Sequence, residues 1–134
     1  MSISELPIIY INLEKRNDRK LNVEYQLNKI KATNIQRFNA IELKNAALGC
    51  SMSHMKCVEL AKKNNYECVF ICEDDIDIIE PDLLVTNVNR FLKTIQEWDV
   101  LVIGGNNMLP YIPVNDNCIQ IKNCQTTTGY IVNK

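Results

Sequence analysis

The sequence predicts an α/β fold in which helices flank a mostly parallel, Rossmann-like sheet. One observation is that short apolar runs alternate along the chain with segments whose apolar residues recur every three or four positions. Another is that the runs Cys68–Cys72 and Val100–Ile103 contain no polar residue, which is typical of strands covered on both faces. The length of 134 residues allows one ordinary domain, residues 1–134.

In the first half of the chain, strands are expected at Pro7–Leu13 and Ile35–Glu42. Asn17 or Asp18 is expected to cap the helix between them. A second helix is expected at Ser51–Asn65, with Ser51 or Ser53 as its cap. The expected apolar faces are Leu21, Tyr25, Leu27 and Ile30 in the first helix, and Met55, Cys57, Val58, Leu60 and Ala61 in the second.

In the second half, the best-defined element is a helix that begins at Pro81. Its apolar stripe consists of Leu84, Val88, Phe91, Leu92 and Ile95. This helix lies between the two uninterrupted apolar runs, and a strand, helix and strand in this order favour a parallel sheet. After the second run, the two prolines of 108–117 predict a loop. Further strands are expected at 118–122 and 126–132, and the edge after Val132 could be covered by a second copy of the chain in a homo-oligomer.

Composition narrows the classes of function. Fifteen basic and 16 acidic residues give a net charge of −1, which argues against a nucleic-acid partner. No apolar run approaches the ~20 residues that span a bilayer, and the first residues do not resemble a signal peptide. Six cysteines without a C-x-x-C pair are expected to be reduced and mostly buried, which together with the missing leader predicts a cytoplasmic protein.

An acidic cluster follows the run Cys68–Cys72 and is the strongest candidate site. It comprises Glu73, Asp74, Asp75 and Asp77. Ligands of open α/β sheets bind outside the carboxyl ends of strands, and crowded carboxylates at such an end favour a hard divalent cation. The alternative is a solvated loop whose charges favour the N-terminus of the helix after Pro81.

Two further segments offer candidate ligand contacts. Arg16 and Arg19 follow the first strand, where guanidinium groups suit phosphate, although they could equally be surface charges beside a helix. His54 is the only histidine, and it could ligate a metal or hold a phosphate oxygen, or simply cap or pack a helix. Gly104 and Gly105 form no dinucleotide-binding or phosphate-loop pattern.

Several of these segments recur together in one known family. The matching pieces are Ile11-Asn12-Leu13 with Arg16-x-Asp18-Arg19, Arg37-Phe38-x-Ala40, Gly49-Cys50-x-x-Ser53-His54, Glu73-Asp74-Asp75, Trp98-Asp99 and Thr128-x-Tyr130-Ile131. In this order and spacing they resemble glycosyltransferase family 25, which includes lipooligosaccharide galactosyltransferases and procollagen galactosyltransferase-like enzymes. The pieces extend over nearly the whole chain.

The resemblance implies a GT-A fold in a minimal or truncated version, and a UDP-sugar donor bound with Mn²⁺ or Mg²⁺. It also implies inverting transfer of galactose or glucose to the hydroxyl of a glycan, or of a hydroxylated protein or lipid. The implied metal ligands are Glu73, Asp75 and Asp77, with Asp75 first among them. The implied nucleotide and donor contacts are Asn12, Leu13, Arg16, Arg19, Ser53, His54 and Asp74.

The length of the chain leaves open whether it contains the acceptor site and the catalytic base. A donor-binding part fits within 134 residues, whereas the acceptor part is expected to be short or missing. An inverting transfer needs a general base, and the spacing of Asp99 and Asp116 marks neither as that base. One alternative is a non-catalytic module that binds a nucleotide sugar. Another is a magnesium-dependent phosphoryl-transfer domain, which also places acids at strand ends.

Overall fold

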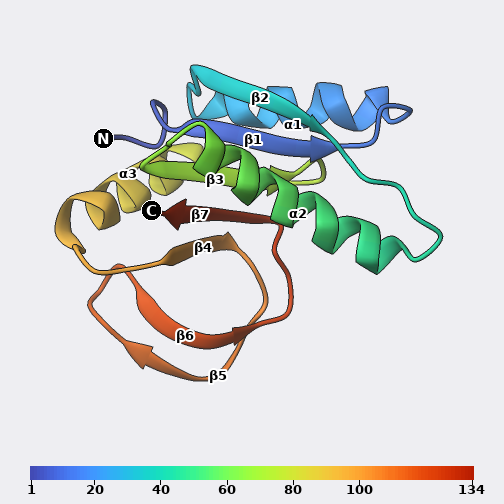
Figure 1. Cartoon of the computed structure of the whole chain (residues 1–134). Coiled ribbons are helices and arrows are strands. Elements are labelled where there is room, and N and C mark those ends of the chain that lie inside the picture. Colours follow the sequence, from blue (N-terminus) through green and yellow to red (C-terminus); the bar gives the residue numbers. More distant parts are fainter.

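The structure, a computed structural model, describes residues 1–134 and contains three helices, a five-stranded sheet and a separate two-stranded hairpin (Figure 1). The α/β class is confirmed. In chain order the elements are β1 (Pro7–Asn12), α1 (Asn17–Lys29), β2 (Asn34–Asn39), α2 (Ala46–Lys63), β3 (Cys68–Glu73), α3 (Pro81–Thr94), β4 (Val100–Gly104), β5 (Asn107–Pro113), β6 (Ile119–Cys124) and β7 (Gly129–Asn133).

The five-stranded sheet is mixed, with the strand order β2-β1-β3-β7-β4. Strand β1 runs parallel to both β2 and β3, whereas β7 runs antiparallel to its neighbours β3 and β4. The sequence predicted a mostly parallel sheet, and the last strand departs from it by inserting in reverse between β3 and β4. The expected free edge after Val132 is therefore wrong, because β7 is an inner strand and the edges are β2 and β4.

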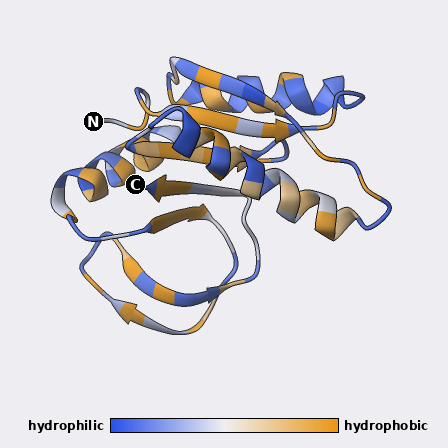
Figure 2. Cartoon of the chain, viewed as in Figure 1, coloured by the Kyte–Doolittle hydropathy of each residue, from blue (hydrophilic) through white to orange (hydrophobic).

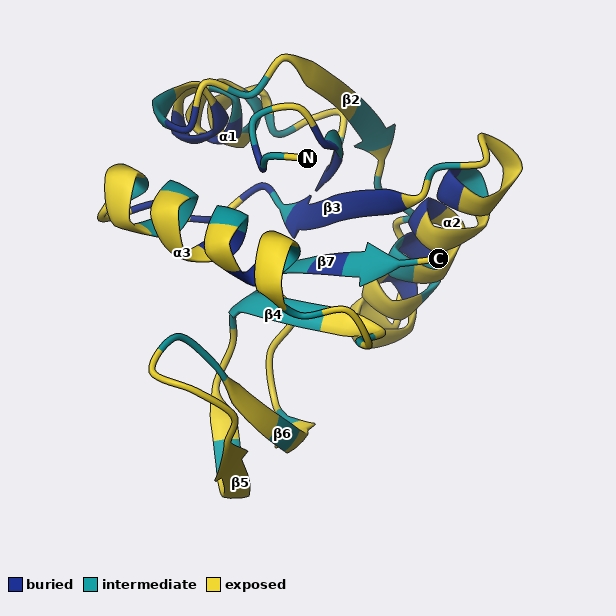
Figure 3. Ribbon diagram, turned by 90° about the vertical axis from the view of Figure 1, so that its left-hand side faces the viewer, coloured by how far each residue is buried: buried dark blue, intermediate teal, exposed yellow.

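Two apolar cores lie on opposite faces of the sheet, because side chains alternate along β1 and β3. Figure 2 shows that apolar residues predominate in both strands. Helices α1 and α3 cover one face and α2 covers the other (Figure 3). The first core includes Ile8, Tyr10, Phe70, Cys72, Leu27 and Val88, and the second consists of Ile9, Ile11, Val69, Ile71, Cys57 and Ala61.

The predicted faces of the first two helices are partly wrong. Leu27 and Ile30 are buried as predicted, but Leu21 and Tyr25 are 61% and 62% exposed, and the helix also buries Val23 and Gln26. The sequence could not predict which side of this helix faces the sheet, because apolar residues occur on more than one side of it. In α2, Met55 and Val58 are also exposed, while the buried residues are Gly49, Ser53, Cys57 and Ala61. The α3 helix begins at Pro81 as predicted and buries Val88 and Phe91.

The predicted starts of α1 and α2 also need correction. Helix α1 begins at Asn17 after Arg16, and no side chain caps it. Helix α2 begins at Ala46 rather than Ser51, because the side chain of Asn45 accepts a hydrogen bond from the Leu48 amide at 3.1 Å. The earlier start adds the turn that carries Gly49 and Cys50 to the helix.

The expected loop at 108–117 is largely a strand. Strand β5 pairs with β6 in a hairpin that stands apart from the main sheet, and Pro110 lies where the pairing register shifts between Met108 and Tyr111. A two-stranded hairpin tolerates proline at such an irregularity, because no ladder hydrogen bond is required there.

None of the three helices combines the length and apolar character needed to cross a bilayer.

Gly49 fixes the start of α2 against the segment that leaves β2. A Cβ atom at this position would lie 2.5 Å from the carbonyl oxygen of Ile41. Gly49→Ala is expected to lower the free energy of unfolding by about 1–2 kcal/mol in urea denaturation, because the steric cost exceeds the helix propensity gained. Gly104→Ala is the control, since its Cβ would meet no atom closer than 3.7 Å. Equal stability of both variants would contradict this packing.

Candidate functional site

The carboxyl ends of β1, β2 and β3 meet at one edge of the sheet. Asn12 pairs in register with Asn39, and Ile11 pairs with Glu73. We call this edge, defined by Asn12, Asn39, Glu73 and the turn that follows Glu73, the carboxyl edge. Ligands of open α/β sheets bind at edges of this kind.

Asn12 is the centre of a buried polar network at the carboxyl edge. It is 2% exposed, and its Nδ2 donates to Asp74 Oδ2 at 2.7 Å and to the Arg16 carbonyl at 3.1 Å. Its Oδ1 accepts from Arg37 Nε at 2.9 Å. Arg19 Nη1 completes the network by donating to Asp74 Oδ1 at 3.2 Å. The network joins the ends of β1, β2 and β3 and leaves both oxygens of Asp74 engaged.

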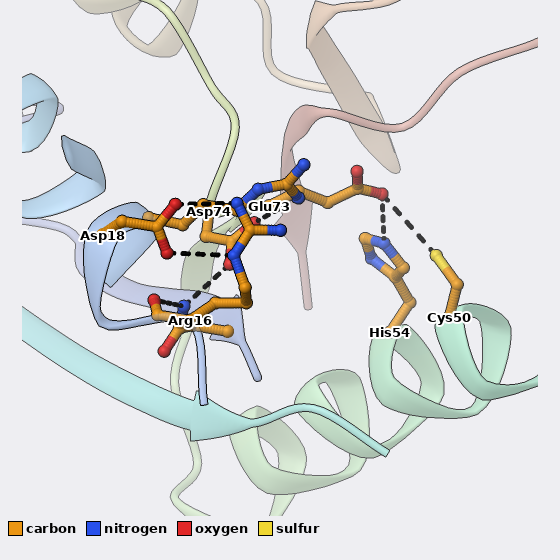
Figure 4. Close-up of polar contacts among 8 residues, drawn as sticks. Arg16, Asp18, Cys50, His54, Glu73 and Asp74 are labelled. Atoms are coloured by element: carbon orange, nitrogen blue, oxygen red, sulfur yellow. Dashed lines mark hydrogen bonds and ion pairs between the residues drawn. The ribbon is translucent and has the colours of Figure 1, made fainter. Parts of the chain in front are cut away.

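Arg16 is paired within its own turn. Its Nε and Nη2 donate to the two carboxylate oxygens of Asp18 at 2.9 and 2.8 Å (Figure 4). The hydrogen bonds from Arg16 lower the pKa of Asp18 to about 2. Both side chains are well exposed, so the pair adds little to stability, but it orients the guanidinium group beside the start of α1.

Glu73 enters a second polar cluster on the α2 face of the sheet. Its Oε1 lies 3.0 Å from His54 Nε2 and accepts from Cys50 Sγ at 3.7 Å (Figure 4). The other ring nitrogen of His54, Nδ1, lies 2.9 Å from the Tyr130 hydroxyl. Glu73 meets α2 because it shares a face of β3 with Val69 and Ile71, which pack against that helix.

The surroundings of this second cluster lower the pKa of its carboxyl group and raise the pKa values of its thiol and its phenol. The hydrogen bond from His54 holds the pKa of Glu73 below its usual value, against the effect of burial. Burial and the neighbouring Glu73 carboxylate raise the pKa of the Cys50 thiol. Burial also raises the pKa of the Tyr130 hydroxyl. Glu73 is therefore the anionic member of the cluster.

The remaining acids, Asp75 and Asp77, are exposed and make no hydrogen bond or ion pair with protein groups. They alternate with Ile76 and Ile78, which are buried in the first core. The four carboxylates thus divide into two that protein groups hold, Glu73 and Asp74, and two that are free. The repulsion expected from the sequence is partly relieved by Arg19 and His54.

The other predicted donor contacts, Leu13 and Ser53, differ in accessibility. Leu13 lines a hollow of about 470 Å³ with Asn39 and Ala40, between the ends of β1 and β2. The hollow forms because the chain leaves β1 toward α1 on one face and leaves β2 toward α2 on the other (Figure 3). Ser53 is 1% exposed, and its hydroxyl donates to the Gly49 carbonyl and accepts from the Ile41 amide. Ser53 therefore supports the edge rather than facing a ligand.

Comparison with known families decides the identity of the chain. The family model described as glycosyltransferase family 25 (LPS biosynthesis protein) matches residues 42–134. The chain belongs to this family. A search of proteins with curated functions found no significant match. The family assigns glycosyltransferase activity in general terms, with a sugar donor and an acceptor as partners.

The family match and the candidate site overlap only in part. The match includes Cys50, His54 and the acidic cluster, but residues 1–41 lie outside it. Residues 1–41 nevertheless contribute β1, an inner strand of the sheet, and two members of the polar network, Asn12 and Arg37. The carboxyl edge of this family 25 chain is therefore built from both segments.

Three residues of the site were not predicted as functional. These residues are Cys50, Arg37 and Tyr130, and each belongs to one of the sequence segments that resemble family 25. Membership in such a segment was the only feature of the sequence that pointed to a functional role. Spacing could not assign them roles, because Tyr130 and His54 are 76 residues apart and meet only through the insertion of β7 beside β3.

The two carboxylates considered as a catalytic base lie away from this site. Asp99 precedes β4, and its carbonyl accepts from the amide of Asn133, the last residue of β7, so it lies at the opposite end of the sheet. Asp116 forms an ion pair with Arg90 of α3. A hollow of about 830 Å³ lies between α3, β4 and the β5–β6 hairpin and is lined mainly by apolar residues, with Asp99 also among the lining residues.

The six cysteines are all free; Cys50 is exposed and Cys118 and Cys124 are partly exposed. Cys57, Cys68 and Cys72 are buried, and burial raises the pKa of Cys57 to about 12. We expect iodoacetamide to alkylate Cys50, Cys118 and Cys124 in the native protein and to leave the buried three unmodified, because only an accessible thiolate reacts. Peptide mass spectrometry checks this, and rapid labelling of Cys57 or Cys72 would contradict the placement of these thiols.

Proposed function

We propose that this chain transfers a hexose, galactose or glucose, from a UDP-sugar to a hydroxyl group of a glycan or of a hydroxylated protein or lipid, with inversion at the sugar carbon. The observation that supports this most is the division of carboxylates at the carboxyl edge. Asp75 and Asp77 are free for a cation, and the adjacent Asp74 holds Arg19 beside them. A cation and a guanidinium group at one edge suit a diphosphate.

The cation we propose is Mn²⁺ or Mg²⁺. Asp75 and Asp77 fit such an ion, because it prefers carboxylate oxygens and neither side chain is committed to a protein partner. Glu73 would join them through Oε2, which makes no hydrogen bond. When bound, the ion supplies charge neutralisation for the diphosphate that leaves the sugar.

The donor would lie across β1 and β2. Leu13 and the hollow between the ends of these strands offer a surface for the nucleoside. Arg16 and Arg19 would contact phosphate oxygens, in partial exchange for their contacts with Asp18 and Asp74. Asn12 and Asp74 would act as positioning residues, since they hold Arg19 and the Arg16 turn in place.

Release of UDP from two donors tests this proposal. The protein is incubated separately with UDP-galactose and UDP-glucose, with Mn²⁺ or with a chelator, in the presence of simple hydroxyl acceptors. We expect metal-dependent release of UDP from one donor in preference to the other. Donor binding without release would favour a non-catalytic nucleotide-sugar module, and hydrolysis of simple phosphate esters would favour a phosphoryl-transfer domain. Failure to bind either donor would contradict the proposal.

A further inference from the structure

The structure brings together three side chains that could ligate a metal. Unlike the acidic cluster, this group contains a thiol and an imidazole beside a carboxylate. The ligand atoms of Cys50, His54 and Glu73 all lie within 4.8 Å of one another. We propose that these three residues form a binding site for Zn²⁺, which uses Oε1 of Glu73, whereas the cation site proposed at Asp75 and Asp77 would use its Oε2. The inference does not depend on donor binding.

Two of the three distances within this group are near those of a tetrahedral zinc site, and the third, between the ligand atoms of Cys50 and His54, is no more than 4.8 Å. Zinc binds sulfur at about 2.3 Å and nitrogen or oxygen at about 2.0–2.1 Å, so ligand atoms stand roughly 3.3 to 3.7 Å apart. Glu73 Oε1 lies 3.0 Å from His54 Nε2 and 3.7 Å from Cys50 Sγ. Small side-chain movements are enough to place an ion between the three atoms.

The positions of the ligands on the fold also suit a metal. Cys50 and His54 are four residues apart on α2, which places both on one face of the helix, as in helical zinc motifs with this spacing. Glu73 approaches from β3, and its amide donates to the Thr128 carbonyl at 2.9 Å. The helix and the strand are packed together through Cys57 and Ile71, so the ligands stand on a rigid base.

Tyr130 supplies the outer contact that metal-binding histidines usually have. Its hydroxyl lies 2.9 Å from His54 Nδ1, so the ring presents Nε2 to Glu73. With zinc on Nε2, Nδ1–H would donate to the Tyr130 oxygen, which fixes the tautomer. The rings of His54 and Tyr130 also lie near each other in a tilted arrangement, with an interplanar angle of 33° and centroids 5.5 Å apart.

The ligand chemistry selects zinc over the hard cations. A thiolate and an imidazole are ligands that Zn²⁺ prefers, whereas Mn²⁺ and Mg²⁺ prefer oxygen. Binding replaces the Cys50 thiol proton, which passes to solvent, by a Zn–S bond, while Glu73 binds as the carboxylate. Three protein ligands leave a fourth position for water.

Cobalt substitution tests the site in the 134-residue chain after removal of metals with a chelator. Co²⁺ is expected to bind in a 1:1 ratio and to give the intense visible bands of a tetrahedral ion together with thiolate-to-cobalt charge transfer in the near ultraviolet. Cys50→Ser should abolish the charge transfer. Tyr130→Phe, which keeps the ring, should weaken binding roughly 10-fold. Cys118→Ser, another accessible cysteine outside the cluster, should leave the spectrum unchanged.

A second measurement needs no variant. In the unmodified protein, Zn²⁺ should slow alkylation of Cys50 at least about 10-fold and leave alkylation of Cys118 unchanged. Weak octahedral cobalt bands without charge transfer, or equal labelling of both cysteines with and without zinc, would overturn the proposal. Asp75→Asn separates the two sites, because it should preserve the cobalt spectrum while reducing Mn²⁺-dependent donor binding.

Discussion

Asn12→Ala is expected to lower the free energy of unfolding by about 3 kcal/mol. The substitution removes a side chain that is 2% exposed and bonds Asp74, Arg37 and the Arg16 carbonyl. Hydrogen bonds to charged groups contribute about 1.5–3 kcal/mol each, and a buried group that loses its partner carries a desolvation cost as well. Asp74 retains Arg19, which keeps the total loss below the sum of the separate bonds.

Asn39→Ala is the matched control for this loss. Asn39 occupies the paired position on β2 and also accepts from Arg37, at 3.2 Å, but it is exposed. Its substitution should cost less than about 1 kcal/mol, because water replaces the lost contact. Urea denaturation of the two variants measures the difference. Equal losses would show that the Asn12 network does not hold the carboxyl edge together.

Asp75→Asn is expected to reduce metal-dependent release of UDP about 100-fold or more, because a ligand of the proposed cation is lost and the leaving diphosphate is less well neutralised. The melting temperature should not change, since Asp75 is exposed and makes no contact with protein groups. Asp77→Asn should act in the same direction. Steady-state assays at saturating Mn²⁺ and thermal melts of the same preparations measure the two effects.

Asp82→Asn is the control for charge. Asp82 is an exposed acid in the first turn of α3, a few residues beyond the acidic cluster. Its substitution should leave UDP release within about twofold of the unmodified protein, because Asp82 is not a proposed ligand and an exposed charge is screened by salt. A similar loss in Asp75→Asn and Asp82→Asn would mean that general negative charge, rather than ligation, supports the activity.

The sequence predicted the α/β class and the approximate position of most elements, since uninterrupted runs such as Cys68–Cys72 and the stripe of α3 each allow one interpretation. It could not predict the reversed placement of β7. Whether a last strand adds at the edge or inserts between two others depends on contacts far apart in sequence, such as the register of Ile71 with Tyr130. The same limit hid the rotation of α1, because Leu21 and Leu27 are both apolar and only packing separates them.

The acidic cluster follows β3 as the sequence predicted, but the sequence did not show which neighbouring elements its side chains contact. Glu73 and Asp74 are neighbours in sequence, yet one turns to α2 and the other to β1 (Figure 4). This divergence follows from the alternation of side chains at the end of β3 and the turn that begins at Asp74. Adjacent acids therefore have different protein partners.

Calorimetric titration with UDP tests the central claim most directly, namely that the carboxyl edge holds a nucleotide diphosphate through a cation at Asp75 and Asp77. We expect UDP to bind the unmodified protein in the presence of Mn²⁺ and to bind at least about 10-fold more weakly with a chelator. The Asp75→Asn, Asp77→Asn double variant should bind weakly under both conditions. Undiminished binding of UDP by the double variant, or no dependence on Mn²⁺ in the unmodified protein, would contradict the account.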